Sequence, residues 1–181
     1  MGRERQHSTS SMPWWMLVLD QTNPIVSSLT ACFVLYTHSA GVAYFAAGAV
    51  ACNLSVKVIK RFIRQPRPAQ TTSARQKSTY GMPSTHTAVI TYFAAYVTLA
   101  CAYLPVHPSL PSGAVSRVLP VIIVLPWATT IAVSRTWLGH HTWPQVGAGF
   151  AYGLLFTPLW FTFWIHGGNH YGRLLEQYLF E

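Results

Sequence analysis

The chain has very few acidic side chains. Only four of its 181 residues are Asp or Glu, and all lie near the ends, at Glu4, Asp20, Glu176 and Glu181. Residues 21–175 therefore offer no carboxylate for a magnesium or calcium site, because these hard cations require several anionic oxygens. We expect any chemistry in this stretch to use no metal ion and no other cofactor.

Charged residues of both signs are scarce as well. They make up 9% of the chain, against about a quarter in a typical globular domain, whereas hydrophobic residues make up 51%. The three cysteines (Cys32, Cys52 and Cys101) lie within apolar runs and show neither disulfide nor zinc spacing. This composition indicates a membrane protein in which cysteine serves as a small hydrophobic residue.

The apolar segments predict an all-α, polytopic membrane bundle of about five spans. We expect the spans at residues 24–36, 40–63, 84–104, 115–133 and 142–165. Residues 13–20 are too short to cross about 30 Å of hydrocarbon, so Trp14 and Trp15 are expected to anchor a short interfacial helix. The expected organisation is a polar N-terminal tail at 1–12, a membrane-embedded domain at 13–170 and a C-terminal tail at 171–181.

Basic residues are concentrated in one segment. Seven of the twelve lie between Lys57 and Lys77. A nucleic-acid-binding protein spreads such residues over a water-facing surface, so this patch beside apolar helices favours an anionic lipid headgroup and argues against nucleic acid. Lys57, Arg61 and Arg64 share a helical face with Lys60; they either snorkel toward lipid headgroups or contact a substrate.

Three polar segments are expected to converge on one membrane face, because successive spans run in opposite directions. The segment ending the second span carries the cations Lys60 and Arg67, which suit phosphoryl oxygens. The segment starting the third span has a proline just before Ser84, so its backbone amides and hydroxyl can point at an anion. The segment between the fourth and fifth spans offers the Arg135 guanidinium and the His141 imidazole.

The three segments read Lys-x6-Arg-Pro from Lys60, Pro-Ser-Thr-His ending at His86, and Ser-Arg-x5-His-x3-Gln ending at Gln145. They resemble the signatures Lys-x6-Arg-Pro, Pro-Ser-Gly-His and Ser-Arg-x5-His-x3-Asp of the type-2 phosphatidate phosphatase superfamily of membrane lipid phosphatases. The resemblance covers residues 40–165. Two positions depart from it, since Thr85 replaces the glycine and Gln145 replaces the aspartate.

The resemblance implies a role for each matching residue. His141 would attack phosphorus to form a phosphohistidine, and His86 would protonate the leaving oxygen. The residues that would hold the phosphoryl oxygens are Lys60, Arg67, Ser84, Thr85 and Arg135. His140 would point about 100° away from His141 on a helix and is not expected in the site.

Gln145 lies four residues after His141, on the same face if the fifth span has begun, and its amide oxygen can accept the imidazole N–H. It can orient the ring but cannot supply a negative charge. The segments His-Thr-Trp-x-Gln-Val (from His141) and Tyr-Gly-Met-Pro-Ser-x-His (to His86) are similar to the dolichyl diphosphatase branch, where glutamine occupies this position. That similarity implies hydrolysis of dolichyl diphosphate to the monophosphate, which recycles the glycan carrier of N-glycosylation at the endoplasmic reticulum.

Other functions stay open on the sequence. The substrate could be phosphatidate or another polyisoprenyl phosphate, and the missing aspartate also allows an inactive lipid-binding scaffold. The basic residues would place the site in the cytoplasm by the positive-inside rule, whereas the branch similarity implies the lumen. We expect a multi-pass protein of the endoplasmic reticulum membrane with a luminal site.

Polar and small residues inside the expected spans are interpreted as packing residues. Asn53 is expected to hydrogen-bond to a neighbouring helix. Gly147, Gly149 and Gly153 are expected to allow close approach of helices.

Overall fold

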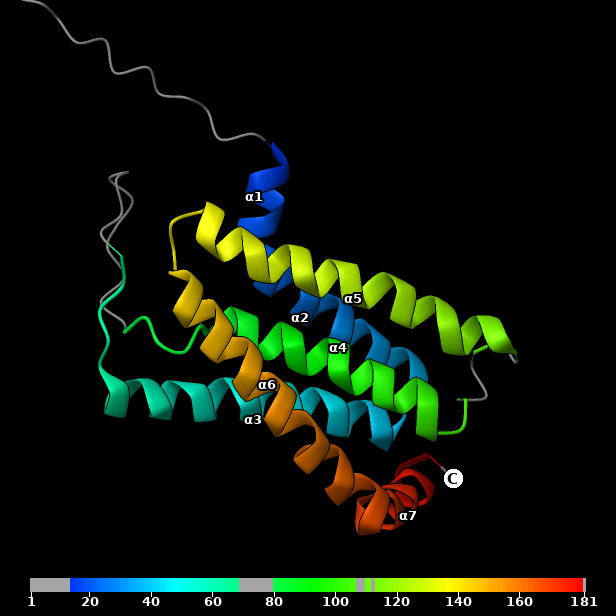
Figure 1. Ribbon diagram of the computed structural model, residues 1–181. Helices are drawn as coiled ribbons and strands as arrows, with labels where there is room; N and C mark the ends of the chain where they lie inside the picture. Colours follow the sequence, from blue (N-terminus) through cyan, green and yellow to red (C-terminus); the bar gives the residue numbers. More distant parts are fainter. Residues whose placement is uncertain (1–13, 69–79, 107–109, 112, 181) are drawn as a thin grey trace, which may run out of the picture.

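The protein is all-helical in the residues that the computed structural model describes, which are 14–68, 80–106, 110–111 and 113–180 (Figure 1). The predicted fold class is confirmed. The expected tail at 1–12 lies outside the described residues. The helices are α1 (Trp14–Asp20), α2 (Thr22–Thr37), α3 (Ala40–Ile63), α4 (Thr85–Tyr103), α5 (Ala114–Trp137), α6 (Trp143–Phe163) and α7 (Asn169–Phe180).

Four helical segments are long and apolar enough to cross a membrane, and they are Ala40–Ile63, Thr85–Tyr103, Ala114–Trp137 and Trp143–Tyr178. The remaining expected span is α2, whose apolar part is the shorter segment Pro24–Thr37. Helix α1 has seven residues, too few to span, and Trp14 and Trp15 are exposed on it. The chain is thus a multi-pass membrane protein with four to five spans.

Helix α4 is the central helix, packed against α3, α5 and α6. Two glycines let α6 approach it closely: a Cβ atom would lie 2.5 Å from the Ser84 carbonyl oxygen at Gly149, and 2.4 Å from the Ala88 oxygen at Gly153. The expectation for Gly147 is wrong, because a Cβ atom there would meet nothing within 4 Å.

Aromatic side chains fill the space between α3, α4 and α6. The Tyr92 hydroxyl donates a hydrogen bond to the Phe45 carbonyl oxygen at 2.8 Å. The Tyr44 ring stacks on Trp160 with 4.9 Å between ring centroids, and its hydroxyl donates to the Trp160 carbonyl. Aromatic pairs of this kind stabilise packing beyond their buried area, so they hold the helices that carry the functional residues in register.

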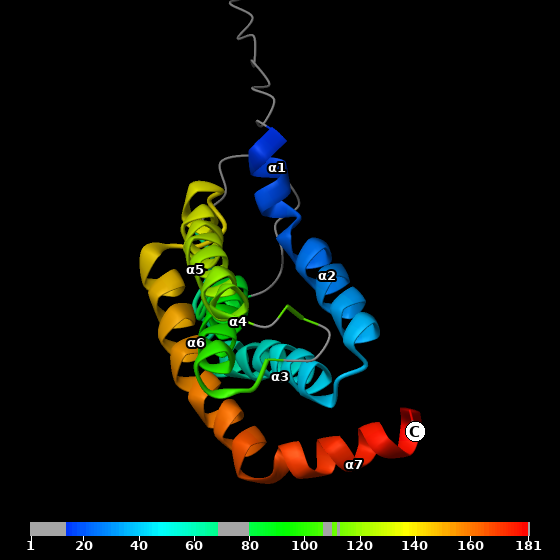
Figure 2. The same cartoon turned by 90° about the vertical axis from the view of Figure 1, so that its right-hand side faces the viewer.

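The C-terminal ends of α3 and α5 and the N-terminal ends of α4 and α6 lie at the same end of the bundle, at the left of Figure 1. Helix α3 ends because Arg64 adopts the left-handed conformation and Pro66 follows. At the other end, Gly167, with φ of +150°, breaks the helix after α6. Helix α7 then runs beneath the bundle in Figure 2, where the Ala40 N–H donates to the Glu176 carboxylate.

Candidate active site

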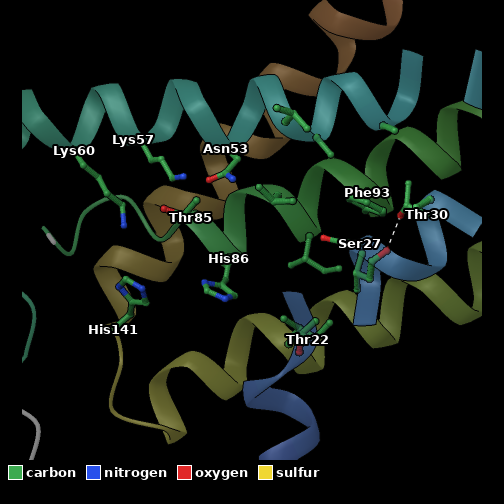
Figure 3. Close-up of a pocket in the computed structure, with 18 of the residues that line it drawn as sticks. Thr22, Ser27, Thr30, Asn53, Lys57, Lys60, Thr85, His86, Phe93 and His141 are labelled. Atoms are coloured by element: carbon green, nitrogen blue, oxygen red, sulfur yellow. Dashed lines mark hydrogen bonds between the residues drawn. The ribbon is translucent and has the colours of Figure 1, made fainter. Parts of the chain in front are cut away.

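A cavity of about 550 Å³ lies between α2, α3 and α4, with Ile131 of α5 also on its wall. At the motif-bearing end of the bundle it is lined by side chains from all three predicted segments (Figure 3). These are Lys60, Arg67, Thr85, His86 and His141. The structure therefore brings together five of the sequence-predicted site residues, although more than 80 residues separate the first from the last.

His141 lies in the turn between α5 and α6 and is only 4% exposed. The backbone N–H groups of His140 and His141 both donate to the Arg135 carbonyl oxygen, at 3.0 and 3.1 Å, which shapes this turn. The imidazole Nδ1 lies 3.1 Å from Oε1 of Gln145. One ring nitrogen thus contacts Gln145, and the other is available to the cavity that His141 lines.

The surroundings of Gln145 determine which of its amide atoms faces the imidazole. Its Nε2 lies 3.0 Å from the Pro66 carbonyl oxygen, which can only accept. Its Oε1 lies 3.3 Å from the Thr142 N–H, which can only donate. Because Oε1 is an acceptor, Nδ1 of His141 must be the donor, and Nε2 of the imidazole must carry the lone pair.

Burial controls the charge of the imidazole. The pKa of His141 is lowered from 6.5 to about 4, mainly by burial, and the charges of Arg67 and Lys60 act in the same direction. The hydrogen bond to Gln145 opposes this shift only in part. His141 is therefore neutral at neutral pH, with its lone pair next to two cationic side chains.

Gln145 also joins the three polar segments to one another. Its Nε2 donates to Oε1 of Gln65 at 3.3 Å, and its backbone carbonyl accepts the Ser84 N–H at 2.9 Å. With Thr142 it forms a capping box at the start of α6. The Thr-x-x-Gln pattern is thus a local signal for Gln145, although its contacts across the site are not local.

Three residues near Gln145 were missed by the sequence analysis as site residues. The Gln145 amide is fixed by the side-chain oxygen of Gln65 and by the backbone carbonyl oxygen of Pro66. No sequence pattern predicts contacts of this kind. Gly81 donates its N–H to the Gln65 carbonyl at 2.7 Å, and a Cβ atom on Gly81 would lie 2.5 Å from Nε2 of Gln145. The only available signal was Gly81 itself, which stands inside the quoted Tyr-Gly-Met-Pro-Ser segment.

Two predicted phosphate-binding residues do not line the cavity. Ser84 is fully buried, and its hydroxyl accepts hydrogen bonds from Thr87 at the start of α4. Arg135 is 1% exposed, and its Nη2 donates to the Leu19 carbonyl oxygen while its Nε contacts Ser134. Contact of these two side chains with a phosphoryl group stays a prediction.

The basic stripe on α3 is divided by the structure. Lys57, Arg61 and Arg64 are all exposed, but of these three only Lys57 lines the cavity, together with the buried Lys60. Asn53 lines the cavity as well. The expected hydrogen bond from Asn53 to a neighbouring helix is wrong for the described part of the chain, where its side chain has no hydrogen-bond partner.

The sequence of this chain is similar to those of known membrane phosphatases. Residues 25–168 match the PAP2 superfamily. Dolichyldiphosphatase 1 from Homo sapiens is 32% identical over 120 residues, covering 64% of this chain and 50% of the relative. Lipid phosphate phosphatase epsilon 1, chloroplastic, from Arabidopsis thaliana is 30% identical over 140 residues, covering 77% and 47%. The chain spans about half the length of these relatives.

The fold is shared with a solved structure. It is the transmembrane PAP2-type phosphatidylglycerolphosphate phosphatase from Bacillus subtilis, with a TM-score of 0.62 and 22% sequence identity over 85% of this chain and 78% of that one. The predicted superfamily resemblance is confirmed by the family match over most of the chain. This chain belongs to the PAP2 superfamily.

Proposed function

We propose that the protein is a metal-independent lipid phosphatase that hydrolyses dolichyl diphosphate to dolichyl monophosphate and phosphate. The observation that carries the proposal is the buried, neutral His141, whose Nδ1 donates to Gln145 and whose Nε2 is available beside Lys60 and Arg67. A neutral imidazole with a defined tautomer is a nucleophile, and adjacent cations suit a phosphoryl group.

In the first step, Nε2 of His141 attacks the terminal phosphorus. The N–P bond forms as the P–O bond to the bridging oxygen breaks, and the electron pair of that bond stays on the bridging oxygen. His86, protonated at the start, gives its proton to this oxygen, and dolichyl monophosphate leaves. Gln145 accepts the Nδ1–H throughout and keeps the ring oriented while the imidazole becomes cationic.

In the second step, a water molecule attacks the phosphohistidine. His86, now neutral, takes a proton from the water, and the N–P bond breaks with its electron pair returning to Nε2. Inorganic phosphate leaves, and His141 returns to its neutral tautomer. Lys60 and Arg67 hold the phosphoryl oxygens in both steps, because cations already in place require little reorganisation as charge shifts.

The substrate assignment rests on two observations about this chain. Glutamine stands at the position that is aspartate in the superfamily signature, and the relatives named dolichyldiphosphatase 1 are 31–35% identical to it over their matched parts. The cavity also continues from the cationic end into a mainly apolar part suited to a hydrocarbon chain. We place the protein in the endoplasmic reticulum membrane with its site facing the lumen.

The test is phosphate release by the purified protein in the presence of a chelator, with dolichyl diphosphate and phosphatidate as parallel substrates. We expect turnover of the diphosphate, and a loss of at least about a thousandfold in His141→Ala, as for other covalent nucleophiles. The matched control is His140→Ala, because His140 does not line the cavity.

Each part of the proposal can fail separately in this assay. Equal or better turnover of phosphatidate would overturn the dolichyl assignment. Unchanged activity in His141→Ala would overturn the mechanism, and no phosphate release from any lipid phosphate would favour an inactive lipid-binding protein.

A further inference from the structure

The cavity contains polar side chains beyond those of the three motifs. Asn53, Lys57 and Lys60 stand at i, i+4 and i+7 on α3, and all three point from this helix into the cavity in Figure 3. A helix rises about 1.5 Å per residue, so Lys57 lies about 4.5 Å along the axis from Lys60. The polar face of α3 thus extends the phosphate-binding end of the cavity toward the middle of the helix.

Nothing in the described residues neutralises this part of the cavity. Neither the Lys57 ammonium nor the Asn53 amide has a hydrogen bond or an ion pair in the part of the chain that the structure describes, and residues 21–175 contain no carboxylate. Lys57 is exposed within the lining and Asn53 is half-buried, and an amide in a membrane-spanning helix is costly unless it has a partner or a function. An anionic ligand in the cavity would supply that partner.

The lining changes in character along the cavity. His141 and Arg67 stand at the cationic end, and Lys57 and Asn53 follow along α3. The rest of the lining is mostly apolar, with Phe93 in it, although α2 adds the hydroxyl groups of Thr22, Ser27 and Thr30. A ligand that matches this order has an anionic head with more than one phosphoryl group and a hydrocarbon chain. A lipid monophosphate would leave Lys57 and Asn53 without an anion.

We propose that Lys57 and Asn53 form a second phosphate subsite, which binds the phosphoryl group that stays on the lipid while Lys60 and Arg67 bind the one that is transferred. This inference rests on the proposed function and extends it to the choice between diphosphate and monophosphate lipids. Two phosphoryl groups that share a bridging oxygen are close enough to occupy adjacent cations one helical turn apart.

The subsite also has a role in the first chemical step. When the bond between phosphorus and the bridging oxygen breaks, the electron pair remains on the phosphate of the departing lipid. The Lys57 ammonium offsets the negative charge of this phosphate, and His86 gives its proton to the bridging oxygen. Lys57 therefore acts as a specificity-determining residue for lipids whose leaving group is itself a phosphate.

The experiment measures kcat/KM of the purified full chain on farnesyl diphosphate and farnesyl monophosphate, which share one apolar chain. In Lys57→Met, we expect the diphosphate to lose at least about tenfold more than the monophosphate, since a charge-assisted hydrogen bond is removed. Asn53→Leu should shift the same ratio in the same direction, and Lys57→Arg should restore most of it. The monophosphate rate reports folding in each variant.

Arg61→Met is the matched control, because it removes one cation from the same helix but outside the cavity lining. Its ratio of kcat/KM on the diphosphate to kcat/KM on the monophosphate should equal that of the wild type. Equal losses on both substrates in Lys57→Met, or no loss on the diphosphate, would overturn the subsite alone. Wild-type protein that releases phosphate from the monophosphate but not from the diphosphate would overturn the proposed function, and the subsite with it.

Discussion

The side-chain amide of Gln145 has two partners on each of its atoms. Its oxygen contacts the His141 imidazole and the Thr142 backbone N–H. Its nitrogen donates to the Gln65 side chain and to the Pro66 carbonyl oxygen. A carboxylate at this position could accept from His141 but could not donate to Pro66. Glutamine therefore orients the nucleophile and ties together two loops at once. The absence of a negative charge beside His141 leaves burial to set its low pKa.

This arrangement predicts a pH effect of Gln145→Glu. His141 is a nucleophile only above its pKa of about 4, so kcat/KM should fall when the pH drops through that value. A carboxylate beside the imidazole stabilises its protonated form and raises the pKa, so the acidic limb should move about 1–3 pH units upward. The measurement is the pH profile of kcat/KM for the wild type and the variant on the same substrate. Ionisation of the substrate then affects both profiles equally, so a difference between them comes from the protein.

An acidic limb at the same pH in both proteins would contradict the assignment of that limb to His141. The same variant should also be less stable, because the Pro66 carbonyl loses its donor. Pro66 is exposed, so its carbonyl oxygen can bond to water instead, and the loss should not exceed about 0.5–1.5 kcal/mol, the contribution of a typical hydrogen bond, which thermal unfolding in detergent would detect.

Among the helices, the contact between α4 and α6 decides where the two histidines stand relative to each other. His86 is on the first turn of α4, and His141 lies two residues before α6 begins. Gly149 and Gly153 bring α6 against carbonyl oxygens of α4. The distance between the helices is therefore set by the absence of side chains on one face of α6.

We predict that Gly153→Ala destabilises the protein. Its Cβ atom would lie 2.4 Å from the Ala88 carbonyl oxygen and 2.9 Å from Cβ of Thr91, so one helix must shift. Overpacking of this kind costs about 1–3 kcal/mol and should lower the melting temperature of the purified protein.

Gly147→Ala is the matched control on the same helix, because its Cβ atom meets no other atom within 4 Å. It should leave the melting temperature unchanged or raise it slightly, since alanine is the better helix former by about 1 kcal/mol. If both variants melted at the same temperature, the close contact of α4 and α6 would not limit stability.

For the whole molecule, the arrangement of helices places α1 and α7 at opposite ends of the bundle. The Leu19 carbonyl of α1 contacts Arg135 near the end of α5, on the side of the active-site cavity. Helix α7 packs against the start of α3, at the far end (Figure 1). Tags attached at the two ends of the chain should therefore report opposite sides of the membrane.

In sealed microsomes, we predict that an N-terminal tag is protected from added protease until detergent is present, whereas a C-terminal tag is digested at once. This result follows if the site faces the lumen. The basic residues near the site would oppose this orientation under the positive-inside rule, but several of them bind phosphate in our proposal and are not free to signal topology. A digested N-terminal tag and a protected C-terminal tag would place the site in the cytoplasm.

Several features could be predicted from the sequence because they depend on local patterns. Apolar run length predicted the all-helical membrane bundle. The three short segments predicted the superfamily by resemblance, and five of their site residues line one cavity, whereas Ser84 and Arg135 do not. The alternation of spans was enough to predict that Lys60, His86 and His141 would stand at the same end, because each span must reverse the direction of the last.

Only the tertiary structure decided which atoms meet. It separated Lys57 from Arg61 on one helical stripe, gave Gly149 and Gly153 but not Gly147 a packing role, and left Asn53 facing a cavity. It also set the tautomer of His141 through a carbonyl oxygen far from it in the chain. These outcomes depend on distances between segments up to about 80 residues apart, and such distances follow from how whole helices pack and not from the residues next to one another in sequence.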